Sequence, residues 1–141
     1  MKTITVKTPA KTYDVLIGAG ILDRAGEQAS KLLGAGNAAI VTDENVDRLH
    51  GKRLEISLEK AGFSVVKFVF PAGEKSKNAD NLIALLNFRA ENGLTRTDTV
   101  FALGGGVVGD LAGLGAAMYL RGDVREAQGS IMTNKYAEGY P

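Results

Sequence analysis

Three consecutive glycines, Gly104 to Gly106, stand between an apolar stretch at 98–103 and a run of residues suited to a helix. A strand that turns through glycines into a helix leaves backbone N–H groups without partners, and the helix dipole favours negative charge there. Glycine also lets a ligand come close, so this turn could hold a phosphate group. The spacing Gly104-x-Gly106-x-x-Gly109 fits the dinucleotide-binding pattern. Alone it is a weak signal, because close packing of a helix on a strand can also require glycine.

Polar residues follow two other apolar stretches that we expect to be strands. Asp43 could accept hydrogen bonds from a ribose diol, or it could simply cap the next helix. In the loop after Phe70, Glu74 and Lys77 could reach ribose, amide or phosphate groups, or they could remain solvated. In open α/β sheets, ligands gather at the carboxyl ends of the strands. We therefore expect Asp43, this loop and the glycine turn to border one site.

Three other polar residues have both a structural and a functional interpretation. Asp110, in the first turn of its helix, could be a ligand contact or only a partner of the helix dipole. Arg121 could clamp a phosphate or a carboxylate, or it could close a helix C-terminus. His50 is expected to be a surface or capping residue.

The elements that must position these residues alternate along the chain. The hydrophobic pattern predicts a β-hairpin and then helices and strands in turn. Such alternation favours an α/β fold of Rossmann-like type, a parallel sheet with helices on both faces. In chain order we expect strands at 4–7 and 13–17, a helix at 21–33, a strand at 38–43, a helix at 46–61, a strand at 63–70, a helix at 78–92, a strand at 98–103 and a helix after the glycine turn.

Composition excludes several classes of function. The 141 residues carry a net charge of +1, which gives no electrostatic case for a nucleic acid or an anionic membrane. No apolar run approaches the roughly 20 residues that span a bilayer, and the opening residues do not resemble a signal peptide. Cysteine is absent and His50 is the only histidine, so the usual zinc or iron ligand sets cannot form. We expect a cytoplasmic protein.

The place of the glycine turn departs from an ordinary dinucleotide-binding fold. That fold carries its glycine pattern in the first strand–helix unit, with an acidic residue about 20 positions later. Here the glycines come last, and no clear strand with a terminal carboxylate follows them. A ligand at this turn would therefore have to be held differently.

The sequence resembles the 3-dehydroquinate synthase family over about residues 1–122. Four stretches carry the resemblance, and the last two are highly specific in combination: Thr42–Val46, Pro71–Lys77, Leu103–Gly113 and Tyr119–Gly122. The family is similar in architecture to glycerol dehydrogenases and uses NAD with a divalent metal, usually zinc or cobalt. It converts 3-deoxy-arabino-heptulosonate 7-phosphate into 3-dehydroquinate and phosphate in the shikimate pathway. The resemblance thus implies a nucleotide-binding domain at 1–122.

The resemblance also implies roles for individual residues. Asp43, Glu74 and Lys77 would contact the adenosine and nicotinamide portions of NAD, and Asp110 would lie by the nicotinamide. Residues 105–107 would cradle the pyrophosphate. The residues expected to line the cofactor are Asp43, Gly73, Glu74, Lys75, Lys77, Gly105, Gly106, Val107, Val108, Gly109 and Asp110.

The same resemblance indicates an incomplete active site. Arg121 would face the substrate phosphate, but the family's metal ligands, a glutamate and two histidines, lie in its C-terminal domain. Most of its substrate-binding residues lie there too. We therefore expect weak NAD binding, no zinc or cobalt site and no catalysis by this chain. A further option is that the chain self-associates through the face that the missing domain would cover.

The last residues do not continue the family pattern. From about 126 to 141 the sequence resembles serine hydroxymethyltransferase through the run Thr133–Pro141. In that family the residues that match Ser130, Tyr136 and Glu138 help form a pyridoxal phosphate site, but the domain that holds this cofactor is not found here. We therefore expect residues 123–141 to be a foreign segment. The alternative to a truncated synthase domain is an engineered or recombined chimera with no enzymatic role.

Overall fold

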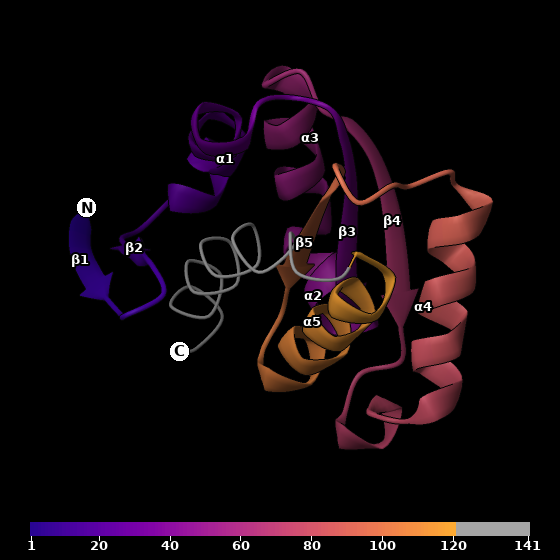
Figure 1. The fold of residues 1–141 in the computed structure, drawn as a ribbon. Helices are drawn as coiled ribbons and strands as arrows, with labels where there is room; N and C mark the ends of the chain where they lie inside the picture. Colours follow the sequence, from indigo (N-terminus) through magenta and orange to yellow (C-terminus); the bar gives the residue numbers. More distant parts are fainter. Residues whose placement is uncertain (121–141) are drawn as a thin grey trace.

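A computed structural model of the chain describes residues 1–120 (Figure 1). The short helices η1 and η3 are of 3-10 type, and η2 is a π-helix. The elements are β1 (Lys2–Lys7), β2 (Thr12–Ile17), η1 (Ile21–Arg24), α1 (Ala25–Leu33), β3 (Asn37–Asp43), α2 (Glu44–Val46), η2 (Asp47–Gly51), α3 (Lys52–Lys60), β4 (Ser64–Phe70), η3 (Glu74–Ser76), α4 (Ala79–Glu91), β5 (Thr99–Leu103) and α5 (Gly106–Leu120).

The central sheet of the described residues has the order β4-β3-β5, and both pairings are parallel. Each crossover between these strands contains a helix, as parallel pairing requires. β3 lies in the middle, and five consecutive residues, 38–42, are buried along it. A strand covered on both faces is expected to be continuously apolar, which explains the sequence Ala38–Val41. The expected α/β fold with a parallel sheet is confirmed.

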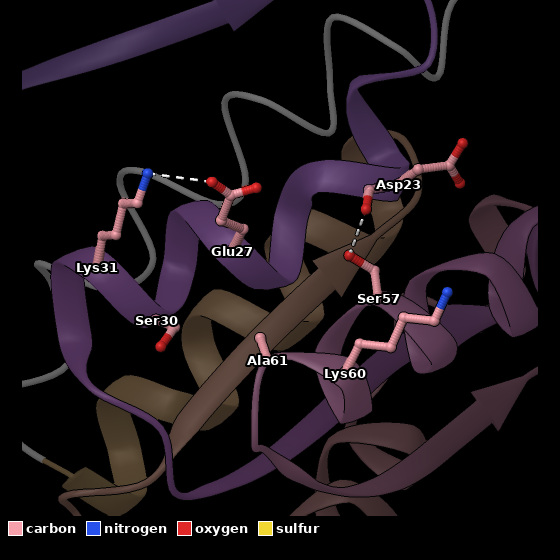
Figure 2. Close-up of a pocket in the computed structure, with 7 residues that line it drawn as sticks. All are labelled: Asp23, Glu27, Ser30, Lys31, Ser57, Lys60 and Ala61. Carbon is pink, nitrogen blue, oxygen red and sulfur yellow. Dashed lines mark hydrogen bonds and ion pairs between the residues drawn. The ribbon is translucent and has the colours of Figure 1, made fainter.

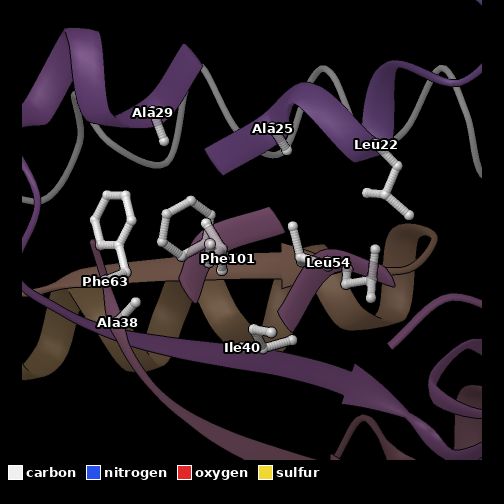
Figure 3. Packing of buried hydrophobic residues seen from close by; sticks show 10 residues of the cluster. Leu22, Ala25, Ala29, Ala38, Ile40, Leu54, Phe63 and Phe101 are labelled. Atoms are coloured by element: carbon white, nitrogen blue, oxygen red, sulfur yellow. The ribbon is translucent and has the colours of Figure 1, made fainter. Parts of the chain in front are cut away.

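One face of the sheet is covered by η1, α1 and α3. Buried side chains from these helices meet the side chains that β3 and β5 direct to this face (Figure 3). At the centre, the rings of Phe63 and Phe101 pack edge to face, with centroids 5.6 Å apart. α1 and α3 approach closely at Gly26 of α1, where an added Cβ would collide with the backbone oxygen of Ser57 in α3. Glycine is therefore required at this position by packing.

The opposite face is covered by α4 and α5. Val100 and Ala102 of β5 face this side, while Phe101 and Leu103 face the first, which is the period-two alternation of a strand. Gly115 lets α5 approach α4, because an added Cβ would lie 2.7 Å from Leu85 Cδ2. Helices on both faces were expected and are observed.

The N-terminal hairpin is a separate two-stranded sheet. β1 and β2 pair antiparallel, with Ile4 opposite Val15, and Figure 1 shows the hairpin standing apart from the parallel sheet. Its turn is closed by Thr8, whose Oγ1 donates to the Lys11 carbonyl over 2.8 Å. The hairpin was expected, and it does not extend the central sheet.

Two predicted helices differ in detail from the structure. The helix expected at 21–33 begins with the 3-10 turn η1, and the helix expected at 46–61 contains the π-helical segment η2. Hydrophobic spacing indicates only that a helix is present, because a single wider turn hardly shifts the pattern. No helix among the described residues is long and apolar enough to cross a membrane.

Candidate functional site

Parallel register brings the carboxyl ends of the three central strands together. Asp43 at the end of β3 is opposite Phe70 at the end of β4, and Thr42 is opposite Leu103 at the end of β5. The buried Thr42 hydroxyl donates to the Leu103 carbonyl over 2.6 Å, which ties β3 to the strand that enters the glycine turn. The segments after all three strands therefore begin at one edge of the sheet.

The glycine turn contains glycines of two kinds. Gly104 is buried, and an added Cβ would lie within 3 Å of Val108 side-chain atoms, so packing alone requires glycine there. Gly106 is exposed, lacks a positive φ and has no atom within 4 Å of an added Cβ. Neither packing nor backbone conformation requires glycine at 106. The space in front of it is what a ligand against the backbone would need.

Backbone N–H groups without an intrahelical acceptor open α5. The first intrahelical bond of α5 runs from the Gly109 N–H to the Gly105 carbonyl over 3.0 Å. The N–H groups of residues 106–108 therefore precede the first acceptor of the helix and lack an intrahelical partner. Together with the helix dipole they form a site suited to a phosphate group. The structure thus has the geometry that the sequence predicted at this turn.

Asp43 caps the helical segment that follows β3. Its Oδ1 accepts a hydrogen bond from the Val46 N–H over 2.8 Å, which is the capping role considered from the sequence. This bond uses one carboxylate oxygen and fixes the side chain at the edge of the sheet. A ribose contact through the other oxygen stays a prediction.

The loop after β4 is held in place by its own hydrogen bonds. Gly73 has a φ of 110°, a conformation that other residues rarely adopt, and it opens the turn that forms η3. The buried Ser76 hydroxyl donates to the Pro71 carbonyl, and the Asn81 side chain donates to the Ser76 carbonyl over 2.8 Å. The loop that carries the predicted ligand contacts is therefore anchored to the start of α4.

A second contact joins this loop to the end of β3. The Ala72 N–H donates to Glu44 Oε1 over 3.4 Å. Glu44 is the first residue of α2, next to the capping Asp43. Glu44 and Thr42 belong to the stretch that carries the family resemblance, but no role was expected for either, because a carboxylate in a first helical turn and a threonine ending an apolar strand are both common.

Lys77 joins the loop to the glycine turn. Its ammonium lies 2.7 Å from a carboxylate oxygen of Asp110 and 3.9 Å from one of Glu74. The hydrogen bond that the Lys77 ammonium donates to Asp110 raises the pKa of Lys77, and the charges of Asp110 and Glu74 raise it further. Three residues that the sequence placed in one site therefore lie together, whereas the Lys75 side chain is exposed and engages none of them in an ion pair.

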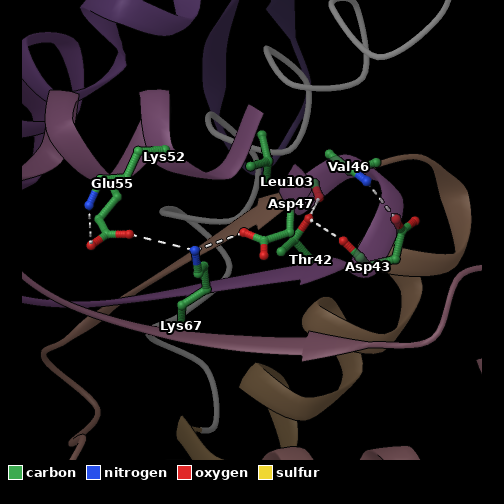
Figure 4. A network of polar contacts seen from close by, with 8 residues as sticks. All are labelled: Thr42, Asp43, Val46, Asp47, Lys52, Glu55, Lys67 and Leu103. Atoms are coloured by element: carbon green, nitrogen blue, oxygen red, sulfur yellow. Dashed lines mark hydrogen bonds and ion pairs between the residues drawn. The ribbon is translucent and has the colours of Figure 1, made fainter. Parts of the chain in front are cut away.

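A polar network on the first face of the sheet supports this arrangement (Figure 4). Lys67 of β4 lies 2.8 Å from Asp47 and 3.6 Å from Glu55, and all three side chains are partly buried. The bond to Asp47 raises the pKa of Lys67. The network fixes η2 and α3 against β4, so its role is to hold the segment that follows Asp43.

An open groove of about 470 Å³ lies elsewhere, between α1 and α3 (Figure 2). It contains none of the residues predicted to bind a ligand. Its charged groups are partly paired, as in the 3.1 Å contact between Lys31 and Glu27, and the Ser57 hydroxyl donates to the Asp23 carbonyl. The groove lies in the helix layer and not at the strand ends, and we assign no chemistry to it.

A metal site does not fit the described residues. Within residues 1–120 no cluster of three or more histidine, cysteine, aspartate or glutamate side chains could hold a metal ion. Arg121, the boundary at 122 and the segment 123–141, with its resemblance to serine hydroxymethyltransferase, all lie outside the described residues.

The chain is similar to known proteins in both sequence and fold. Residues 67–132 match the family model for the 3-dehydroquinate synthase N-terminal domain. A 3-dehydroquinate synthase from Streptococcus suis is 45% identical over 119 residues, which is 84% of this chain and 34% of the relative. The chain thus spans about a third of the length of that relative.

Two solved structures have a similar fold. A 2-deoxy-scyllo-inosose synthase in complex with carbaglucose-6-phosphate, NAD+ and Co2+ has a TM-score of 0.76 at 21% identity, over 86% of this chain and 32% of that one. The 2-epi-5-epi-valiolone synthase of Streptomyces hygroscopicus, with NAD+ and Zn2+ bound, has a TM-score of 0.65 at 26% identity, over 86% and 32%.

The pairing of Lys77 with Asp110 predicts a measurable titration. The folded-state pKa of Lys77 is raised, so the stabilisation from the pair is complete below the unfolded value near 10.5 and is lost as pH rises through the folded pKa. Asp110→Asn should lower the pKa of Lys77, as NMR of the lysine ε-carbons can measure. Glu91→Gln, at the far end of α4, should leave it unchanged. An unaltered Lys77 pKa in D110N would show that the pair does not form.

The family model and the curated relatives agree, and they confirm the resemblance drawn from the sequence: this chain is similar to the N-terminal part of 3-dehydroquinate synthases.

Proposed function

We propose that the chain binds NAD at the carboxyl edge of its sheet, with the pyrophosphate at the glycine turn. The open space in front of Gly106 carries this proposal, since nothing within the described chain requires a glycine there. The NAD+ named in two structural neighbours supports it. A cytoplasmic location, expected from the sequence, is part of the proposal.

Each residue group would serve a different part of the cofactor. The N–H groups that open α5 would bind the pyrophosphate, because charge-assisted bonds to a helix N-terminus are strong. Asp43, fixed by its capping bond, would accept a ribose hydroxyl through its second oxygen. Glu74, Lys77 and Asp110 lie together in the structure and would face the nicotinamide part.

NAD titration by calorimetry tests this proposal. We expect weak binding, with a Kd above the micromolar range, because only one wall of the cofactor cleft is described. Gly106→Val should reduce affinity about tenfold or more, since the side chain denies phosphate the backbone N–H groups. Gly36→Val, at another glycine with open space around it, is the matched control and should bind as the parent does. Equal affinities of Gly106→Val and Gly36→Val for NAD would show that NAD does not bind at the glycine turn.

We further propose that the chain does not catalyse the synthase reaction. The family needs a divalent metal, which would act as a Lewis acid when bound, and the described residues hold no cluster for one. The chain also spans only about a third of its curated relatives.

Release of phosphate from 3-deoxy-arabino-heptulosonate 7-phosphate, with NAD and zinc added, measures that activity directly. No release above the uncatalysed background is expected, with a full-length synthase as the positive control. Turnover near that of the control enzyme would contradict the proposal.

A second candidate function is a non-enzymatic folded chimera that self-associates. The exposed face of α5 favours it, because Leu114 and Met118 are 51% and 57% exposed and lie one turn apart. An apolar face of this kind promotes association. Light scattering at high concentration should then give a dimer mass that falls to a monomer mass in Leu114→Lys, and a monomer in both would exclude this candidate.

A further inference from the structure

Asp110 and Gly106 lie on the same exposed face of α5, one helical turn apart. Side chains at this spacing are about 6 Å apart. The Asp110 side chain is 59% exposed and lies one helical turn beyond the N–H groups that open the helix. A negative charge is therefore built in next to a site suited to phosphate.

The charge of Asp110 is only partly cancelled. Lys77 contacts it over 2.7 Å, but the same ammonium also lies 3.9 Å from Glu74. Two carboxylates thus share one ammonium, and the side chains of this group sum to −1. The backbone N–H groups and the helix dipole attract a phosphate, while the side-chain charge opposes it.

A ligand can offset this repulsion only if it brings hydrogen-bond donors to the carboxylates. A dinucleotide does so through ribose hydroxyls and a carboxamide, whereas free pyrophosphate near neutral pH offers few P–OH donors and carries more negative charge than the diphosphate diester of a dinucleotide. We propose that Asp110 is a specificity-determining residue that excludes free polyphosphates from the glycine turn, and that Lys77 limits the repulsion enough for a dinucleotide to bind. The inference rests on the proposed function, because it takes the turn to be a phosphate site.

Calorimetry with inorganic pyrophosphate tests the exclusion. Asp110→Asn removes the charge with little change of shape and should bind pyrophosphate about fivefold more tightly than the parent, as expected for one unit charge at this range in water. Lys77→Met, which leaves both carboxylates unpaired, should bind it more weakly, and K77M/D110N should recover at least the parent's affinity. Glu91→Gln makes the same charge change at the far end of α4 and should match the parent.

The location of the effect is tested by adding Gly106→Val to D110N, which should abolish the gain. A gain that survives this second substitution, or a D110N variant that binds pyrophosphate no better than the parent, overturns the proposal. Circular dichroism and thermal melts of each variant check that the fold is retained.

The same variants titrated with NAD separate this inference from the proposed function. The affinity of D110N for NAD should rise less than its affinity for pyrophosphate, since NAD loses a carboxylate acceptor in this variant. Equal increases in affinity for the two ligands would show that Asp110 acts only as a general charge, and would overturn the proposed specificity. If the parent binds no NAD while D110N binds pyrophosphate more tightly than the parent, the NAD proposal fails and the exclusion of pyrophosphate by Asp110 stands. If NAD binds and D110N gains nothing, the exclusion alone fails.

Discussion

The parallel pairing of β3 with both β4 and β5 is the constraint on which the rest of the structure depends. It aligns the ends of three strands at one edge, so the capping Asp43, the 71–78 loop and the glycine turn all start from the same place. The Thr42 hydroxyl bound to the Leu103 carbonyl fixes the two strand ends that matter most. A slip of one residue would reverse every side chain and separate these groups.

The glycine turn contains one glycine that packing requires and one that packing leaves unexplained. Gly104 is explained by Val108, which would collide with any side chain there, whereas Gly106 is not explained by any contact within the described chain. Sequence alone left both interpretations open; the structure shows the packing role for Gly104, and a binding role for Gly106 stays a proposal. The ion pair between Lys77 and Asp110 adds a partly neutralised carboxylate one helical turn beyond Gly106.

Much of the fold could be predicted because the spacing of apolar residues and the positions of glycines indicate the same elements along the chain. Continuous apolar strands such as 38–41 predicted burial on both faces, and glycines marked most helix ends. The π-helical turn at 47–51 could not be predicted, since hydrophobic spacing tolerates one wider turn. Lys77 and Asp110 were expected in one site, but their direct ion pair could not be predicted, because it depends on how the loop after β4 folds back towards α5.

NMR titration of the ¹⁵N-labelled chain with NAD tests the central claim most directly. If NAD binds at the carboxyl edge, the amide signals of residues 105–108 should shift first, together with those of Lys77 and Asp43. Shifts confined to the groove around Lys31 and Lys60, or no shifts at millimolar NAD, would contradict the account.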